Sequence, residues 1–222
     1  MKWRTRVKVC GLTRTEDIHS AVEAGVDAIG LVFYPKSSRL VALEQAERLR
    51  REVPALVSVV ALFVNAAPSE VQAVIERVRP DVLQFHGEES PVYCDQFGMR
   101  YMKAFRVGAP GLDTPERVLA ACQAFPDAAA WLFDSYSAGY GGSGLAFDPA
   151  LIDLVQAHDD RRPIVLAGGM RQDTVQRSIE LIHPYAVDVS SGVEVSGGIK
   201  SAEKIREFML AVKKADEIAQ SI

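Results

Sequence analysis

The sequence contains few cysteines, and their spacing limits what they can do. Only three cysteines occur among 222 residues, Cys10, Cys94 and Cys122. Their number is odd, and they show neither the pairing typical of disulfide frameworks nor the short repeats that bind zinc. We therefore expect no disulfide scaffold and no metal site, and any cysteine with a function acts as a free thiol.

Long apolar runs and basic clusters are also missing. The sequence has no stretch of about 18 apolar residues, the length of a membrane-spanning helix, and the opening MKWRTR lacks the apolar core of a signal peptide. Its 25 Lys and Arg residues against 29 Asp and Glu give a formal net charge of −4, without any basic run interleaved with aromatic residues. We expect a cytoplasmic protein that binds neither membranes nor nucleic acid.

The sequence does contain a regular alternation of short apolar runs with amphipathic segments. The runs are rich in Val, Ile, Leu and Phe without polar alternation, which is typical of strands buried on both faces of a parallel sheet. The expected strands are residues 7–10, 28–33, 57–64, 81–85, 101–105, 130–134, 163–168 and 186–190. The segments between them, such as residues 71–78, have apolar residues at helical spacing.

Eight strands alternating with helices favour a closed (β/α)8 TIM barrel, a single α/β domain covering residues 1–222. An open α/β sheet is the alternative, although it rarely repeats so regularly. Local patterns mark several helix starts. Thr13 with Glu16 three residues later forms a capping box, and Thr114 and Asp148 each precede a proline at the first helical position.

In such barrels the active site lies at the carboxyl ends of the strands. Cys10 ends the first expected strand and Asp134 ends the sixth, so both should point to one mouth of the barrel. The loops after the last three strands are rich in glycine, at residues 139–144, 167–170 and 190–194. Because glycines let backbone N–H groups approach an anion closely, we expect these loops to bind a phosphate group.

Seven motifs occupy the expected strand and loop ends along nearly the whole chain. They are KVCGLT (8–13), GLVFYPKSSR (30–39), LQFHGEE (83–89), LFDS (132–135), YGGSG (140–144), LAGGM (166–170) and VDVSSGVE (187–194). In this order they resemble the phosphoribosylanthranilate isomerase family of tryptophan biosynthesis. The resemblance implies an Amadori rearrangement of a small sugar-phosphate substrate, N-(5′-phosphoribosyl)anthranilate, without cofactor or metal.

The resemblance also implies roles for particular residues. Asp134 maps to the general acid that protonates the ribose ring oxygen, and Cys10 to the general base that removes the C2′ proton. A thiol suits this task because its reference pKa of about 8.5 can be brought nearer neutrality by positive charge. Arg39 maps to the residue that holds the anthranilate carboxylate, for which a guanidinium fork is well shaped.

Further residues of the motifs are expected to bind substrate rather than to catalyse. They are His86, Gly142, Gly144, Gly168, Gly169, Asp188, Ser191 and Gly192. A lone histidine is more often structural, so His86 is left out of the catalytic pair, and Asp188 is expected to orient the loops. We interpret Cys94 and Cys122, on expected helices, as packing residues.

One departure from the family pattern and three rival functions bear on this interpretation. Residues 197–201, GGIKS, replace the family's proline and aspartate, which predicts a looser loop. The rivals are the histidine-pathway sugar isomerase, which uses two aspartates and a substrate with two phosphates, a metal-dependent epimerase, and a non-enzymatic sugar-phosphate sensor. The chain is expected to be a monomer or a homodimer.

Overall fold

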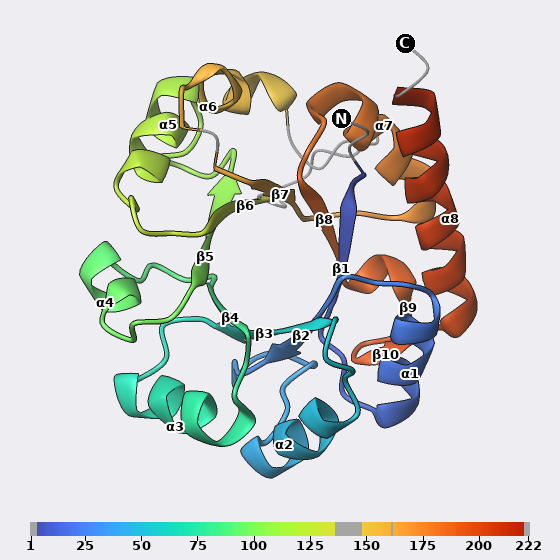
Figure 1. The fold of residues 1–222 in the computed structure, drawn as a ribbon. Helices are drawn as coiled ribbons and strands as arrows, with labels where there is room; N and C mark the ends of the chain where they lie inside the picture. The colour runs from blue at the N-terminus through green and yellow to red at the C-terminus, as the bar shows by residue number, and fades with distance from the viewer. Residues whose placement is uncertain (1–3, 136–147, 161, 220–222) are drawn as a thin grey trace.

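The computed structural model describes residues 4–135, 148–160 and 162–219, and in them eight parallel strands close into a barrel (Figure 1). Each strand pairs with the next one along the chain, and β8 returns to pair with β1. The strands are β1 (Arg6–Cys10), β2 (Ala28–Val32), β3 (Ser58–Phe63), β4 (Val82–Phe85), β5 (Tyr101–Val107), β6 (Ala130–Ser135), β7 (Ile164–Leu166) and β8 (Ala186–Val189). The predicted TIM barrel is confirmed, with strand ends shifted by one or two residues.

Helices surround the barrel on its outside (Figure 1). They are α1 (Thr15–Glu23), α2 (Leu43–Arg51), α3 (Pro68–Val78), α4 (Pro91–Asp95), α5 (Pro115–Gln123), α6 (Asp153–Ala157), α7 (Gln172–Ile182) and α8 (Ala202–Ala219). The helical spacing of apolar residues explains their placement, since Ile18 and Ala21 share one face of α1 and both are buried in the core. Two short 3-10 helices, η1 (Pro149–Ile152) and η2 (Ser191–Val193), precede α6 and follow β8.

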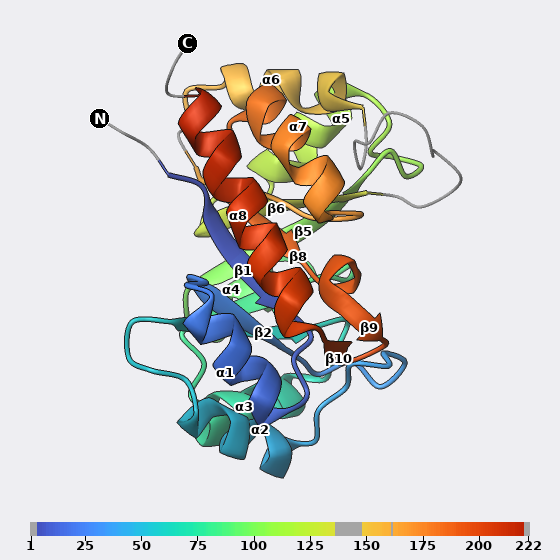
Figure 2. The same ribbon diagram turned by 90° about the vertical axis from the view of Figure 1, so that its right-hand side faces the viewer.

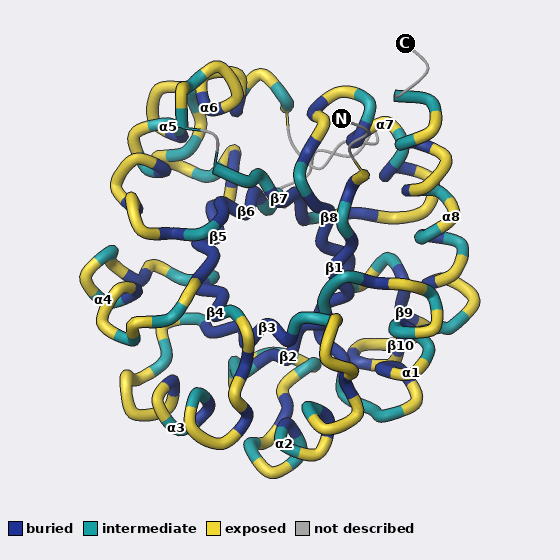
Figure 3. The backbone as a smooth tube through the Cα atoms, in the orientation of Figure 1, coloured by how far each residue is buried: buried dark blue, intermediate teal, exposed yellow. Residues whose placement is uncertain are grey.

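The side chains of each strand point alternately outward to the helices and inward to the barrel axis. In β6, Trp131 and Phe133 join the large core between strands and helices, whereas Leu132 belongs to the inner lining. That lining consists mainly of Val and Ala, and Cys10 lies in a separate small cluster at the carboxyl end. Figure 3 accordingly shows a ring of buried backbone inside helices whose outer sides are exposed.

The capping box predicted at Thr13 is wrong. α1 begins at Thr15 without a side-chain cap, because the Thr13 hydroxyl instead donates a hydrogen bond to the Gly198 carbonyl oxygen at 2.6 Å. The other two predicted helix starts are confirmed. Thr114 accepts a hydrogen bond from a backbone N–H at the start of α5, and Asp148 does so at the start of η1.

A small hairpin follows η2 at the carboxyl end of the barrel, beside the start of α8 (Figure 2). Its strands are β9 (Glu194–Ser196) and β10 (Ile199–Lys200). This is the segment in which glycine replaces the family's proline and for which the sequence predicted a looser loop. In the structure the turn is a defined hairpin that uses Gly198 at φ +81°, a conformation that favours glycine.

A buried ion pair holds the loop after β4. Lys103 on β5 donates from Nζ to Glu89 Oε2 at 2.9 Å and to the Gly87 carbonyl oxygen at 2.6 Å. The side chains of Lys103 and Glu89 are only 4% and 2% exposed. Glu89 also accepts hydrogen bonds from the backbone N–H groups of Asn65 and Gly87. The pair therefore fixes the backbone that follows His86.

Replacement of Lys103 by methionine should destabilise the protein, because Glu89 would remain buried without its counter-ion. Breaking a buried pair costs about 3–5 kcal/mol, whereas replacing both partners costs less. Urea unfolding of Lys103→Met should show this loss, and the double variant Lys103→Met/Glu89→Gln should recover part of it. Lys214→Met, on an exposed position of α8, is the control. Equal stability of the Lys103 and Lys214 variants would contradict the prediction.

Candidate active site

A cavity of about 320 Å³ opens at the carboxyl end of the barrel. Eight of the predicted site residues line it: Cys10, Arg39, His86, Asp134, Gly168, Gly169, Asp188 and Ser191. Gly192 adjoins Ser191 in η2 without lining the cavity, and Gly142 and Gly144 lie outside the described residues. The barrel thus brings together residues from the ends or following loops of six strands, as the strand-end rule predicts.

Cys10 lies at the end of β1 beside a buried ion pair. Two residues earlier in the strand, Lys8 donates from Nζ to Asp188 Oδ2 at 2.7 Å, and the two side chains are 5% and 6% exposed. The pairing of β1 with β8 places Lys8 directly opposite Asp188. Gly30 on β2 leaves room beside them, because a Cβ there would lie 2.8 Å from Cys10 Sγ and 3.2 Å from Lys8 Cε. The thiol and the lysine chain are therefore neighbours inside the barrel.

The surroundings of Cys10 act on its pKa in opposite directions. Burial raises the pKa of the thiol because the thiolate loses hydration, and the Lys8 ammonium opposes this by stabilising the thiolate. Burial prevails, so the pKa of Cys10 lies above its ordinary value. Burial also disfavours charge on Lys8, but the Asp188 carboxylate outweighs it and raises the pKa of Lys8. Lys8 therefore keeps its positive charge beside the thiol.

Asp134, near the end of β6, contacts a histidine from the loop after β4. His86 Nε2 lies 2.9 Å from Asp134 Oδ2, and His86 Nδ1 lies 3.1 Å from Nε2 of Gln84. The two ring nitrogens of His86 thus each face a polar side chain, Gln84 on one side and Asp134 on the other. His86, expected only to bind substrate, thus orients Asp134 directly.

Glycines bring the loops after β7 and β8 close to the other groups. A Cβ on Gly168 would lie 2.4 Å from Asp134 Oδ1, and a Cβ on Gly192 would lie 2.1 Å from the Met170 carbonyl oxygen. Gly168 and Gly169 have φ angles of +73° and +66°, which glycine adopts without strain. The start of η2 adds backbone N–H groups that the short helix itself cannot pair. These loops can therefore offer backbone donors to an anion.

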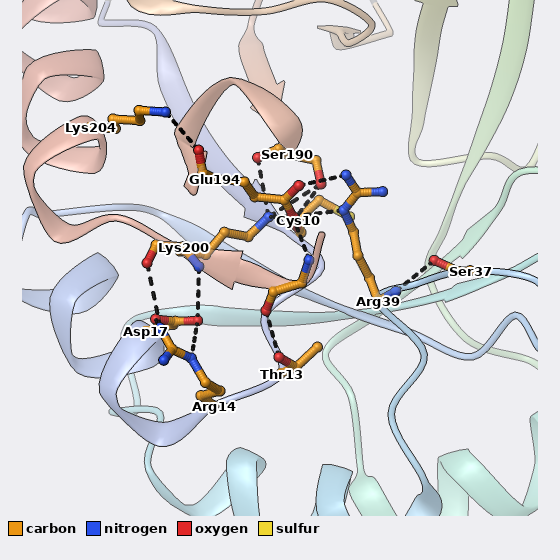
Figure 4. Close-up of polar contacts among 11 residues, drawn as sticks. Cys10, Thr13, Arg14, Asp17, Ser37, Arg39, Ser190, Glu194, Lys200 and Lys204 are labelled. Carbon is orange, nitrogen blue, oxygen red and sulfur yellow. Dashed lines mark hydrogen bonds and ion pairs between the residues drawn. The ribbon is translucent and has the colours of Figure 1, made fainter. Parts of the chain in front are cut away.

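Arg39 enters the cavity from the loop after β2 and binds Glu194. Its Nε and Nη2 donate to the two carboxylate oxygens of Glu194 at 2.8 and 2.7 Å (Figure 4). Lys200 is fully buried and donates from Nζ to Glu194 Oε1 at 2.8 Å. Burial alone would raise the pKa of Glu194, but the hydrogen bonds from Arg39 and Lys200 lower it to about 2. Glu194 is therefore an anion at neutral pH.

Two oxygen atoms in the cavity wall have no hydrogen-bond partner among the described residues. They are Gln84 Oε1 and Asp188 Oδ1, both buried. Buried acceptors are normally paired, because an unpaired one loses its hydration without compensation. A bound molecule that carries hydroxyl groups would satisfy both atoms.

Metal clusters and membrane-spanning helices are both absent from the described residues. No group of three or more His, Cys, Asp and Glu side chains in residues 4–135, 148–160 and 162–219 could hold a metal ion. None of the helices in these ranges has the length and apolar character needed to cross a membrane.

Comparison with known proteins connects this geometry to a family. The family model of N-(5′-phosphoribosyl)anthranilate (PRA) isomerase matches residues 7–211. The chain belongs to this family. The PRA isomerase of Bordetella avium (strain 197N) is 60% identical over 214 residues, covering 96% of this chain and 98% of that protein. That of Dechloromonas aromatica (strain RCB) is 48% identical over 216 residues, covering 96% and 99%.

Solved PRA isomerase structures share the fold. The enzyme from Thermotoga maritima superposes with a TM-score of 0.84 at 37% identity and covers 95% of this chain and 99% of its own. A second structure, in complex with reduced 1-(o-carboxyphenylamino)-1-deoxyribulose 5-phosphate, has a TM-score of 0.81 at 34% identity, with the same coverage. The predicted family and the predicted isomerase activity are confirmed.

Lys8, Glu194 and Lys200 are charged groups at the PRA isomerase site that the sequence analysis did not single out. Lys8 could have been recognised, because it is a charged residue within an apolar strand. A buried charge needs a partner of opposite charge, here on a neighbouring strand. Glu194 closes the last motif, but 155 residues separate it from Arg39. No local pattern could have joined these two residues.

The reactivity of Cys10 toward iodoacetamide should depend on pH in a defined way. The rate of alkylation follows the fraction of thiolate, so it should rise with pH. Because the pKa of Cys10 is raised, the pH of half-maximal rate should lie above the ordinary thiol value of about 8.5. Lys8→Met removes the stabilising ammonium, so it should move the midpoint still higher, and Lys214→Met should leave it unchanged. Mass spectrometry of Cys10 peptides measures the rates.

The two remaining cysteines provide an internal reference for this experiment. Cys94 on α4 and Cys122 on α5 are buried in the core, as predicted. Burial raises the pKa of Cys94 to about 12, so it should stay unmodified in folded protein. A Cys10 midpoint below the ordinary thiol value, or one unmoved in Lys8→Met, would contradict the assigned environment.

Proposed function

We propose that Asp134 and Cys10 carry out the isomerisation of N-(5′-phosphoribosyl)anthranilate as general acid and general base. The observation that carries this proposal is their placement: one ends β1, the other nearly ends β6, and both line one cavity in a chain of this family. Positioned acid and base groups with different surroundings are what a proton-transfer sequence needs.

The reaction begins with proton donation from Asp134 to the ribose ring oxygen. Ring opening leaves a Schiff base between the anthranilate nitrogen and C1′. The Cys10 thiolate then takes the proton from C2′, and the electron pair of that bond forms the enolamine. In the tautomerisation the proton of the enol hydroxyl at C2′ moves to C1′, which gives the 1-deoxyribulose product. The proton held by Cys10 returns to Asp134 through solvent, so both groups are restored and the atoms of the substrate are conserved.

The remaining groups hold the substrate in this pose. Arg39 binds the anthranilate carboxylate through guanidinium donors that Glu194 does not use. Asp188 Oδ1 and Gln84 Oε1, which lack partners among the described residues, accept hydrogen bonds from sugar hydroxyls. His86 keeps Asp134 aligned with the ring oxygen. No cofactor or metal takes part in this scheme.

The 5′-phosphate is bound by the loops after β7 and β8. Backbone N–H groups of Gly168, Gly169, Ser191 and Gly192 donate to it, and this end of a TIM barrel is a frequent phosphate site. Gly142 and Gly144, which lie outside the described residues, remain predicted to bind substrate.

Assembly and location belong to the same proposal. The Thermotoga maritima enzyme is described as a dimeric isomerase, of which engineered monomers have been solved. For this chain a monomer or a homodimer remains the prediction, as does a cytoplasmic location without membrane or nucleic-acid partners.

Removal of either catalytic group should abolish most activity without unfolding the protein. A positioned acid or base contributes roughly 10²–10⁴-fold, so Cys10→Ala and Asp134→Asn should each lower kcat by that factor or more. Because both groups serve one reaction sequence, the double variant should lose much less than the product of the single losses. The decrease in substrate fluorescence measures turnover.

The controls for these variants separate catalysis from folding. Circular dichroism and the affinity for the reduced product analogue should stay near those of the parent, since both changes are small. Asp159→Asn, at an exposed position, makes the same chemical change as Asp134→Asn away from the site. A folded Cys10→Ala protein with parental turnover would make Cys10 a packing residue.

The phosphate assignment can be tested with a matched pair of glycine variants. Gly169 and Gly98 have similar φ angles of +66° and +60°, and a Cβ on either would meet no atom within 4 Å. Alanine therefore strains both backbones by a similar amount, about 1–2 kcal/mol. Only Gly169→Ala should raise KM and the inhibition constant of inorganic phosphate. Similar constants for the two variants would refute the phosphate site.

A further inference from the structure

We propose that Glu194 is a positioning residue that selects which edge of the Arg39 guanidinium meets the substrate carboxylate. This inference rests on the proposed function, in which Arg39 is the carboxylate ligand. It adds a determinant of substrate specificity that never touches the substrate. Hydrogen bonds connect Arg39, Glu194 and the hairpin β9–β10 (Figure 4).

The guanidinium of Arg39 is only half used. An arginine has five N–H donors in a planar fork. Glu194 takes the Nε edge through Nε and Nη2, so one donor of Nη2 and both donors of Nη1 remain. Figure 4 shows the third nitrogen pointing away from Glu194. Arg39 lines the cavity, so this second edge can receive a carboxylate in the same bidentate geometry.

Glu194 is occupied by contacts within the protein. Its Oε1 accepts from Arg39 Nε, from Lys200 Nζ and from the Gly198 N–H at 3.2 Å, and its Oε2 accepts from Arg39 Nη2. The residue is 8% exposed. Because Glu194 is buried and does not line the cavity, we infer that its effect on substrate binding passes through Arg39.

The support behind Glu194 is rigid. Lys200 lies opposite Glu194 in the hairpin pairing, and its Nζ also donates to the carbonyl oxygen of Ser190 at 3.2 Å. The backbone N–H of Lys200 donates to Asp17 on α1, which Arg14 holds in turn. The hairpin is therefore bonded to α1 and to the end of β8 through Lys200. Glu194 is held by this hairpin and in turn positions Arg39.

The stem of Arg39 is equally confined. A Cβ on Gly11 would lie 2.3 Å from Arg39 Cδ, so the side chain lies against the backbone directly after Cys10. At its base, the Arg39 N–H donates to Ser37 Oγ at 3.1 Å. With stem and Nε edge both held, rotation of the guanidinium is blocked, and its free edge has one orientation relative to the thiol.

The charges of the cluster also match a single carboxylate. Burial lowers the pKa of Lys200, and its hydrogen bond to Glu194 opposes this. With Lys200 protonated, Arg39, Lys200 and Glu194 together carry one positive charge. One carboxylate of the substrate would neutralise it. Glu194 thus allows a buried lysine and an arginine to lie close together without attracting a second anion.

The test compares two ligands in Glu194→Gln. One is reduced 1-(o-carboxyphenylamino)-1-deoxyribulose 5-phosphate, and the other is the same molecule without its carboxyl group. Neutral glutamine cannot accept both Arg39 donors, so affinity for the carboxylate ligand should fall about tenfold, within the usual range for coupled neighbours. Affinity for the second ligand should change less than about twofold. KM should rise more than kcat falls.

Further variants separate orientation from charge and from folding. Glu194→Gln/Lys200→Met keeps the charge of the cluster and avoids an unpaired buried lysine, and it should show the same selective loss. In an Arg39→Ala background, Glu194→Gln should have no additional effect. Glu203→Gln, at an exposed position of α8, is the control and should bind both ligands like the parent.

Each outcome distinguishes this inference from the proposed function. If Arg39→Ala weakens both ligands equally, Arg39 is not the carboxylate ligand, and the proposed function fails at that residue together with this inference. If Arg39→Ala is selective but Glu194→Gln weakens both ligands equally, Glu194 is only structural. Tighter carboxylate binding by Glu194→Gln would show that net charge prevails over orientation, and would overturn the inference.

Discussion

The catalytic end of this molecule depends on the ion pair between Lys8 and Asp188 inside the barrel. Two charges that are 5% and 6% exposed are costly to desolvate, and they are tolerated because they meet at 2.7 Å. They meet because β8 pairs with β1 in register, which closes the barrel. The pair places a cation next to Cys10, which opposes the rise in the pKa of the thiol that burial causes. The strand pairing that closes the barrel therefore also sets the charges beside the thiol.

The surroundings of Asp134 and of Cys10 are built by different means. Asp134 is oriented at the cavity wall by His86, and the missing side chain of Gly168 lets the loop after β7 pass directly against it. Cys10 instead lies beside the buried charges of Lys8 and Asp188, which act on its pKa. Gly30 has no side chain, so it leaves room for the thiol and the lysine chain. The two groups thus have separate surroundings, which suits the different roles proposed for them.

Much of this architecture could be predicted from the sequence, for physical reasons. Burial on both faces leaves unbroken apolar runs, so the strands and the barrel follow from them, and the strand-end rule places Cys10 and Asp134 at one mouth. Thr13 was misjudged because its hydroxyl has a competing acceptor 185 residues away. Glu194 was missed for the same reason: its contact with Arg39 exists only after the barrel closes. Local patterns do not encode contacts of this kind.

The β1–β8 pairing also has a consequence for the protein during its synthesis. Lys8 and Asp188 are 180 residues apart, so at about 5–20 residues per second their translation is separated by roughly 10 to 40 seconds. Cys10 is made before β8 by that interval, and until β8 pairs with β1 one side of the first strand has no neighbour. Oxidants and electrophiles can then approach Cys10 from a side that the closed barrel later covers. In the folded enzyme the cavity is the route that remains.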